Sequence, residues 1–179
     1  MKHIEEKRLI KKCIGKDRLA QRVLYEQYKT AMFSTAYRIT NDWDLANDVL
    51  QDGFIKVFEN LHQYNGVGAL GGWIKIIVVR AALKEVKGLQ MYVEVDDKIA
   101  DDICFDDNLT GELLAKIMDT LPDKCRVVFN LIEVEGYKHK EVASLLNIQL
   151  GTVKSQLHYA KKLLKQKLNQ RGYERGNER

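Results

Sequence analysis

Proline is nearly absent from this chain of 179 residues, in which Pro122 is the only one. The alternation of apolar and polar residues that marks β-strands is also scarce. Apolar residues recur instead every three or four positions, the spacing that gathers them on one face of a helix. Because proline interrupts helices and strand patterns are rare, the sequence predicts an all-α fold.

Cysteine is scarce as well, and the three residues Cys13, Cys104 and Cys125 form no Cys-x-x-Cys pair. This spacing predicts neither a disulfide framework nor a zinc site, so we expect isolated thiols in a reducing compartment. We expect no metal and no cofactor.

Long apolar runs are missing too, since none approaches the roughly 20 residues that a membrane-spanning helix needs. The N-terminal residues, MKHIEEKRLIKK, are charged and lack the apolar centre of a signal peptide. We therefore expect a cytoplasmic protein without membrane insertion.

The net charge of +4 at pH 7 is unevenly distributed. Basic residues outnumber acidic ones in 1–87 and in 113–179, whereas 88–112 is strongly acidic. Two basic lobes on either side of an acidic segment fit a protein that contacts nucleic acid at two places. We expect two small helical domains, 1–87 and 110–170, joined by a flexible acidic linker, 88–109. A polar tail, 171–179, follows the second domain.

The stretch Tyr137–Leu168 indicates a function most directly, because it predicts two helices joined by a tight turn. Asn147 stands at the turn and tolerates a left-handed backbone, and Thr152 is placed to cap the second helix. The polar residues expected on the outer face of the second helix are Lys154, Gln156, His158, Lys161, Lys162, Lys165 and Lys167. No acidic residue lies between Glu141 and Glu174. This pattern predicts a helix-turn-helix for a DNA major groove, and the alternative is an ordinary helical hairpin with a solvated basic face.

Four helices are expected in the first domain, at about Glu5–Ile14, Asp17–Ile39, Trp43–Asn60 and Trp73–Lys87. Thr40, Asn41 and Asp42 interrupt the apolar pattern and offer caps for the third helix. The inward residues expected in the second helix are Leu19, Val23, Leu24, Tyr28, Met32, Phe33, Ala36 and Ile39. Those expected in the fourth helix are Ile74, Ile76, Ile77, Val78, Ala81, Ala82 and Leu83.

Asp44, Asp48 and Asp52 form an acidic stripe on the third helix, each about one turn after the last. The stripe has three interpretations: a solvated face, a docking surface for a basic partner helix, or a metal site. No histidine or cysteine joins the three carboxylates, which disfavours the metal site.

Residues 66–72 include four glycines and predict a flexible loop whose backbone can come close to a ligand. Trp73 opens the helix that follows, and this helix has a basic edge formed by Lys75, Arg80, Lys84 and Lys87. The combination suits single-stranded nucleic acid, because aromatic rings stack on bases and basic groups follow the phosphates. Taken alone, Trp73 is more often a core residue than a stacking platform.

The segment Gly151-Thr152-Val153-Lys154-Ser155, followed by Leu157-His158 and Ala160-Lys161, resembles the recognition helix in region 4 of extracytoplasmic-function sigma factors, a group of the sigma-70 family. The segment Leu45–Phe54 resembles the part of region 2 that docks on the polymerase clamp. Gly66–Trp73 and Arg80–Leu83 resemble the part that opens and reads the −10 promoter element. The resemblance extends from about Asp17 to Leu168, apart from the linker, and the order of the motifs makes it specific.

The resemblance implies a protein without catalytic activity that binds core RNA polymerase and promoter DNA and is restrained by an anti-sigma factor. It assigns polymerase docking to Asp48, Gln51 and Asp52. It assigns the −10 strand to Trp73, Lys75, Arg80 and Lys84. It assigns the −35 duplex to Thr152, Lys154, Ser155, Gln156 and Lys161, with Lys138 and His139 near its phosphates. The same resemblance implies that the acidic linker passes through the RNA exit path of the polymerase. The alternative interpretation of the linker is a solvated tether.

The sequence departs from the family pattern at several positions. Gly71 stands where a basic or polar residue is frequent, and Ala81 stands where an asparagine commonly follows the arginine. In the recognition helix, Leu150, Gln156 and Tyr159 replace residues that are more often charged. These differences concern the preference for bases rather than the class of protein.

Two other functions compete with this one. A free-standing helix-turn-helix repressor or activator would normally dimerise on paired half-sites, and the acidic stripe of the first domain disfavours it. An enzyme would use the three aspartates of the stripe with His62, but no paired base, nucleophile or metal set accompanies them.

Overall fold

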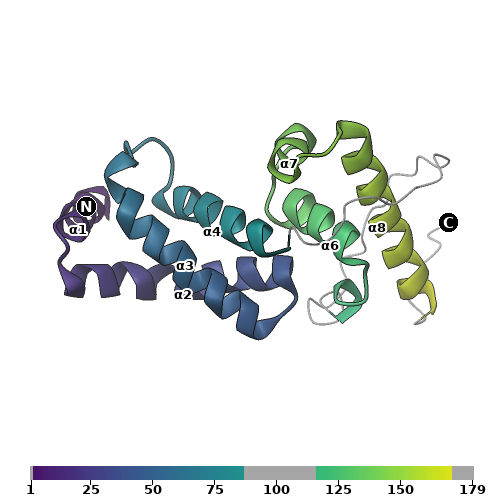
Figure 1. Cartoon of the computed structure of the whole chain (residues 1–179), viewed down its shortest axis with the longest axis horizontal. Helices are drawn as coiled ribbons and strands as arrows, with labels where there is room; N and C mark the ends of the chain where they lie inside the picture. The colour runs from purple at the N-terminus through teal and green to yellow at the C-terminus, as the bar shows by residue number, and fades with distance from the viewer. Residues whose placement is uncertain (1, 87–115, 171–179) are drawn as a thin grey trace, which may run out of the picture. The chain divides into compact units, whose positions relative to one another are not determined.

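The computed structural model describes residues 2–86 and 116–170, and all of their regular secondary structure is helical (Figure 1). The chain divides into two units, which we call unit 1 (Met1–Gly88) and unit 2 (Leu89–Arg179). The expectation of an all-α protein with two helical domains is confirmed. The predicted linker, 88–109, and the tail, 171–179, lie outside the described residues. Nowhere in the described ranges is a helix both long enough and apolar enough to cross a membrane.

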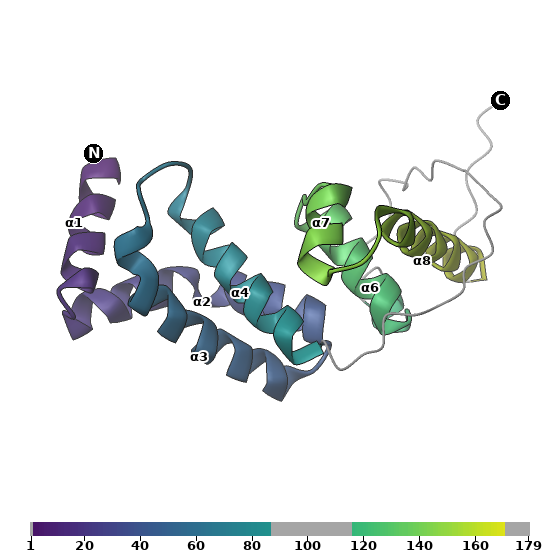
Figure 2. The same ribbon diagram turned by 45° about the horizontal axis from the view of Figure 1, so that its top comes forward.

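Unit 1 contains the helices α1 (Lys2–Ile14), α2 (Arg18–Thr40), α3 (Trp43–Asn60) and α4 (Leu70–Val86), with a 3₁₀ turn, η1 (Leu61–Gln63), after α3. The helices α2, α3 and α4 pack against one another, and α1 lies across the beginning of α2 and against η1 (Figure 2). The fully buried residues at the centre of this bundle include Leu24, Ile39, Val57, Leu70, Ile74 and Val78.

Side-chain caps define where the helices of unit 1 begin and end. Asp17 accepts hydrogen bonds from the backbone N–H groups of Leu19 (2.9 Å) and Ala20 (3.1 Å) at the start of α2. Asn41 ends α2 in the left-handed conformation, with φ 54°, and Asp42 accepts the N–H of Leu45 at 2.8 Å to begin α3. The predicted caps between these two helices are therefore present.

Three apolar residues that were expected to face inward point to solvent instead. Leu19 is 76% exposed, Val23 55% and Ile76 39%. At the start of α2 the core is formed by Ala20 and Leu24, which have the same four-residue spacing as Leu19 and Val23 but lie on another side of the helix. The prediction was wrong there because two apolar rows run along this part of α2 and only the row of Ala20 and Leu24 is buried.

Two glycines allow close approach between the helices of unit 1. A Cβ atom on Gly71 of α4 would lie 2.9 Å from Cε1 of Tyr28 on α2, and one on Gly53 of α3 would lie 3.1 Å from Cγ2 of Val78 on α4. Both distances are shorter than ordinary van der Waals contacts. The helices thus pack with backbone against side chain at these two points.

Unit 2 contains α6 (Asp123–Phe129), which continues as a π-helical turn, η2 (Asn130–Val134), and then α7 (His139–Leu146) and α8 (Leu150–Gln170). Residues 116–118 are helical as well. α8 packs against α6 and α7, and α7 also contacts η2 (Figure 1). The core of this unit includes Ile117, Val128, Leu131, Val142, Val153 and Leu164.

The turn between α7 and α8 has the predicted conformation. Asn147 is left-handed, with φ 55° and ψ 48°, and its backbone N–H bonds to the carbonyl oxygens of Ala143 and Ser144. The expected cap at Thr152 is wrong, because α8 already begins at Leu150 and the N–H of Val153 bonds to the carbonyl oxygen of Gln149 at 3.2 Å. Thr152 therefore lies within the first turn of α8.

Candidate functional site

The first candidate surface is the beginning of α7 and α8, the two helices of the helix-turn-helix. Lys138 is exposed and His139 is half-buried where α7 begins, and Glu141 accepts the backbone N–H of Lys138 at 2.7 Å. On α8, Lys154 is exposed, whereas Thr152 and Ser155 are half-buried. The hydroxyl of Ser155 donates to the carbonyl oxygen of Thr152 at 3.1 Å.

The outer side of α8 carries the basic residues that the sequence placed there. Lys154, Lys162 and Lys165 are exposed, and the apolar row Val153, Leu157, Ala160, Leu164 and Leu168 is buried on the opposite side. Lys161 is the exception among the proposed contacts, because its amino group forms a 2.9 Å ion pair with Glu133 of η2 and its side chain is only 22% exposed. A DNA contact through Lys161 would have to break or share this pair.

Gln156 was expected on the outer face of α8, and this placement is wrong. Its side chain is 1% exposed, and its Oε1 accepts a hydrogen bond from the thiol of Cys125 on α6 at 2.8 Å. Gln156 follows Val153 by three positions and precedes Ala160 by four, which places it in the buried row. That spacing was the signal in the sequence, but the polar side chain concealed it. Burial raises the pKa of the Cys125 thiol to about 11.

The second candidate surface is the solvent face of α3. Asp44, Asp48, Gln51 and Asp52 are all exposed there, and helical spacing puts them on one side of the helix. In the described parts of the chain, no three His, Cys, Asp or Glu side chains are arranged to hold a metal ion. Among the described residues none of the three carboxylates forms an ion pair, so this face presents exposed negative charge to a partner.

The structure separates His62 from this acidic face. His62 lies in η1, beyond the end of α3, whereas Asp44 lies in its first turn. At about 1.5 Å of rise per residue, the 18 positions between them correspond to roughly 27 Å, and the ten positions from Asp52, the nearest of the three aspartates, to roughly 15 Å. None of the three carboxylates can act together with His62 in acid–base catalysis, which removes the basis for the enzyme interpretation.

The third candidate surface is the loop before α4 together with the outer side of that helix. α4 begins at Leu70, three residues earlier than predicted, so Trp73 lies within its first turn. Trp73 and Lys75 are half-buried, whereas Arg80 and Lys84 are exposed. Trp73, Arg80 and Lys84 are seven and four residues apart and share one side of α4, while Lys75 lies on another side. The structure thus brings three of the four predicted residues together.

Tyr64 belongs to this third surface, although no motif in the sequence predicted it. Its ring centroid lies 5.8 Å from that of Trp73, and its hydroxyl donates to the carbonyl oxygen of Gly68 at 2.7 Å. Gly66 and Gly68 have φ values of 76° and 78°, which favour glycine, and Val67 between them is 79% exposed. An aromatic residue just before a glycine-rich loop was the signal that could have identified Tyr64.

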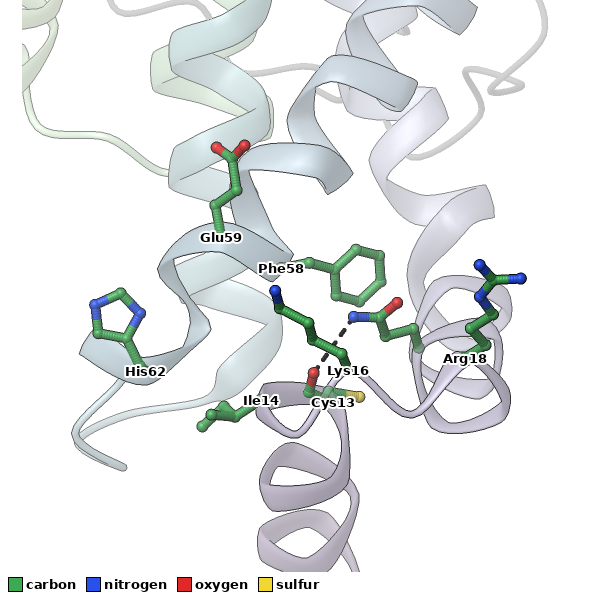
Figure 3. Close-up of a pocket in the computed structure, with 8 residues that line it drawn as sticks. Cys13, Ile14, Lys16, Arg18, Phe58, Glu59 and His62 are labelled. Carbon is green, nitrogen blue, oxygen red and sulfur yellow. Dashed lines mark hydrogen bonds between the residues drawn. The ribbon is translucent and has the colours of Figure 1, made fainter.

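A cavity of about 850 Å³ lies where α1, α2, α3 and η1 meet (Figure 3). Its lining includes Cys13, Lys16, Arg18, Phe58, Glu59 and His62. The amide nitrogen of Gln21 donates to the carbonyl oxygen of Cys13 at 3.3 Å across its wall. Burial, and secondarily the Asp17 carboxylate, raises the pKa of the Cys13 thiol, so this cysteine is not an activated nucleophile.

Comparison with known proteins identifies both units. Residues 24–90 match the family "Sigma-70 region 2", and residues 111–164 match the family "Sigma-70, region 4". The chain is 28% identical over 153 residues to the "ECF RNA polymerase sigma factor SigE" of Mycolicibacterium smegmatis, covering 79% of this chain and 59% of that protein. It is 24% identical over 180 residues to the "ECF RNA polymerase sigma factor SigW" of Bacillus subtilis, covering 90% and 96%.

Two solved structures share the fold. One is RpoE of Bartonella quintana in complex with the anti-sigma factor NepR, with a TM-score of 0.53, 18% identity, and coverage of 83% of this chain and 96% of that one. The other is CnrH in complex with the cytosolic domain of CnrY, with a TM-score of 0.51, 16% identity, and coverage of 90% and 96%.

Proposed function

The chain belongs to the extracytoplasmic-function group of the sigma-70 family, and from this membership we propose that it binds core RNA polymerase and directs initiation at promoters with particular −10 and −35 elements. The observation that carries the proposal is the presence, in one chain, of both family regions, at 24–90 and 111–164. Proteins of this family are non-catalytic subunits of RNA polymerase.

We assign polymerase docking to Asp48, Gln51 and Asp52 on α3. Their exposure on one side of a helix supports this role, since carboxylates left in solvent are free to pair with a basic partner surface.

We assign the −10 strand to the side of α4 that carries Trp73, Arg80 and Lys84, with Tyr64 beside Trp73. Two aromatic rings next to a glycine loop offer a place for unpaired bases, and the two cations lie along the helix where phosphates would follow. Lys75 lies on another side of α4, so its predicted contact would involve a different part of the strand.

We assign the −35 duplex to the first turns of α8, through Thr152, Lys154 and Ser155, with Lys138 and His139 near the phosphates at the start of α7. A recognition helix places its N-terminal residues against base edges in the major groove. Gln156 is not part of this surface because its side chain is buried. Lys161 contributes only if its ion pair with Glu133 opens.

An anti-sigma factor is a further proposed partner. The solved structures of RpoE and CnrH that share this fold are complexes, in the first case with a protein named as an anti-sigma factor. We also propose the cytoplasm as the place of action, because promoter DNA and the polymerase are found there.

Reconstitution with core RNA polymerase tests the proposal. We expect the full chain to bind core polymerase and to produce run-off transcripts from promoters of its own organism. Specific DNA binding without polymerase, by a dimer on paired half-sites, would instead favour the free-standing regulator. Failure both to bind core polymerase and to initiate would refute the sigma-factor function.

The docking assignment has its own test. The double substitution Asp48→Arg and Asp52→Arg should abolish core binding without unfolding unit 1, because both positions are exposed. A matched control variant reverses the charge of two exposed acidic residues that lie outside α3, Glu5 and Asp119. This variant should bind core polymerase normally. If the α3 variant still binds, the docking face lies elsewhere.

A further inference from the structure

Trp43, the first residue of α3, is an exposed aromatic residue that the functions above do not use. Its side chain is 64% exposed, although tryptophan is strongly buried on average. Together with the half-buried Phe33 and Tyr37 of α2 it forms an aromatic cluster at the surface, and contiguous apolar patches commonly mark surfaces that a partner covers. Tryptophan is also among the residues that dominate binding energy at protein interfaces.

The Trp43 ring is held in position by two aromatic residues of α2. Its centroid lies 4.5 Å from that of Phe33, with the rings inclined by 65°, and 6.2 Å from that of Tyr37. Edge-to-face contacts of this kind are favourable beyond the area that they bury. A ring fixed in this way loses little side-chain entropy when a partner covers it.

The backbone beneath Trp43 is fixed as well. Asp42 caps α3 through the N–H of Leu45 at 2.8 Å, and the amide nitrogen of Asn47 donates to the carbonyl oxygen of Trp43 at 2.9 Å. The ring is therefore presented from the rigid first turn of a helix rather than from a loop.

The charges around Trp43 favour a basic protein over a nucleic acid. Asp42 and Asp44, on either side of it in the chain, are both exposed. A lysine or arginine can lie over the indole ring and pair with these carboxylates at the same time. A phosphate backbone would instead be repelled by the two carboxylates.

Trp43 lies at the N-terminal end of α3, at the border of its docking face. Asn47 and Gln51 follow Trp43 by one and two helical turns, so this row leads to one member of the proposed docking set. Asp48 and Asp52 lie about 140° and 180° around the helix from Trp43. A partner on the acidic face therefore reaches Trp43 past Asp44, around the N-terminal end of α3.

We propose that Trp43, seated on Phe33 and Tyr37, is an aromatic anchor for a basic segment of core RNA polymerase. It extends the docking surface of Asp48, Gln51 and Asp52 to the start of α3. The inference rests on the proposed function, since it names a further contact to the same partner.

The affinity of the full chain for core polymerase tests this contact. Trp43→Ala should weaken binding by about 30-fold, the loss typical of an interface anchor. Trp43→Phe, which keeps an aromatic ring, should lose less. Trp43→Arg should lose more than Trp43→Ala, because it places a positive charge against a basic partner. The matched control is Leu19→Ala, which removes an exposed apolar side chain of α2 elsewhere in unit 1 and should leave the affinity unchanged.

The outcomes separate this inference from the proposed function. If the wild-type chain does not bind core polymerase, the proposed function fails. If the wild type binds, the Asp48→Arg and Asp52→Arg variant does not, and Trp43→Ala binds within about 2-fold of wild type, only the anchor is refuted. A Trp43→Ala variant that binds core normally but loses affinity for an anti-sigma factor or for promoter DNA also refutes it, because the ring then serves that partner.

Discussion

The thiol of Cys125 on α6 donates a hydrogen bond of 2.8 Å to Oε1 of Gln156 on α8, inside the core of unit 2. Both residues are 1% exposed. The amide nitrogen of Gln156 finds no hydrogen-bond partner among the described residues. Because a thiol is a weak donor, this bond offsets only a small part of the cost of burying the amide.

Gln156→Leu should therefore stabilise unit 2, by about 1 kcal/mol, since it removes a buried and unsatisfied N–H group while filling similar space. Hydrogen exchange of the α8 amides in the full chain measures the change, and Gln166→Leu, at an exposed position of α8, is the control. A loss of protection would mean that the glutamine has a partner that offsets its burial. Affinity for the −35 element should not change, in contrast to what a base-reading role for Gln156 would require.

Gly71→Ala should destabilise unit 1 by about 1–2 kcal/mol, because the new Cβ would lie 2.9 Å from Cε1 of Tyr28 and force the ring to shift. Gly72→Ala is the matched control, since a Cβ there meets nothing within 4 Å. Alanine should stabilise that position by about 0.5–1 kcal/mol, as it does inside helices generally. Trp43 and Trp73, the two tryptophans of the chain, both lie in unit 1, so urea unfolding followed by tryptophan fluorescence measures this unit alone. Equal effects of the two substitutions would show that Tyr28 does not restrict the position.

Lys154→Ala should lower affinity for −35 DNA and reduce the slope of log affinity against log salt by about 1, because one phosphate contact is lost. The holoenzyme with duplex −35 probes across a salt series provides the measurement. Lys116→Ala removes an exposed lysine of unit 2 that lies outside α7 and α8 and should change neither quantity. An unchanged salt slope for Lys154→Ala would remove this residue from the interface.

The stability of unit 2 should fall at alkaline pH. The Cys125 thiol keeps its proton in the folded state up to a pKa of about 11, against an ordinary value of 9.0, because burial disfavours the thiolate. Its contribution is fully present below pH 9 and is lost as the pH rises toward 11, by up to about 2–3 kcal/mol. Urea unfolding followed by circular dichroism at pH 8, 9 and 10 measures the loss. Comparison with Cys125→Ala isolates it, because that variant should lack this part of the pH dependence.

Local signals in the sequence predicted the boundary between α2 and α3 and the turn after α7, whereas the starts of α4 and α8 were placed too late. Asn41 and Asp42 end one helix and begin the next through their own side chains and backbone, and Asn147 adopts the left-handed turn that its chemistry permits. Each of these features depends on a few consecutive residues, so no knowledge of the tertiary packing was needed. The family resemblance added the order of the two regions, which the comparisons confirm.

Positions that depend on packing were predicted less well. Leu19 and Val23 are apolar at helical spacing, yet both are more than half exposed, whereas Gln156 is polar and is covered by α6. In each case the face of the helix is decided by what packs against it, which the residue's own hydrophobicity does not reveal. The pairing of Lys161 with Glu133 and the contact of Tyr64 with Trp73 likewise join segments that are separated in the chain.

The close contact between Gly53 and Val78 couples the positions of α3 and α4. A Cβ on Gly53 would lie 3.1 Å from Cγ2 of Val78, so the two helices are in direct contact at this point, and close-packed contacts transmit displacement from one element to the next. This contact links α3, which we assign to polymerase docking, to α4, which we assign to the separated DNA strand. We therefore expect the orientation of α3 on the polymerase to influence the orientation of α4 toward the DNA strand.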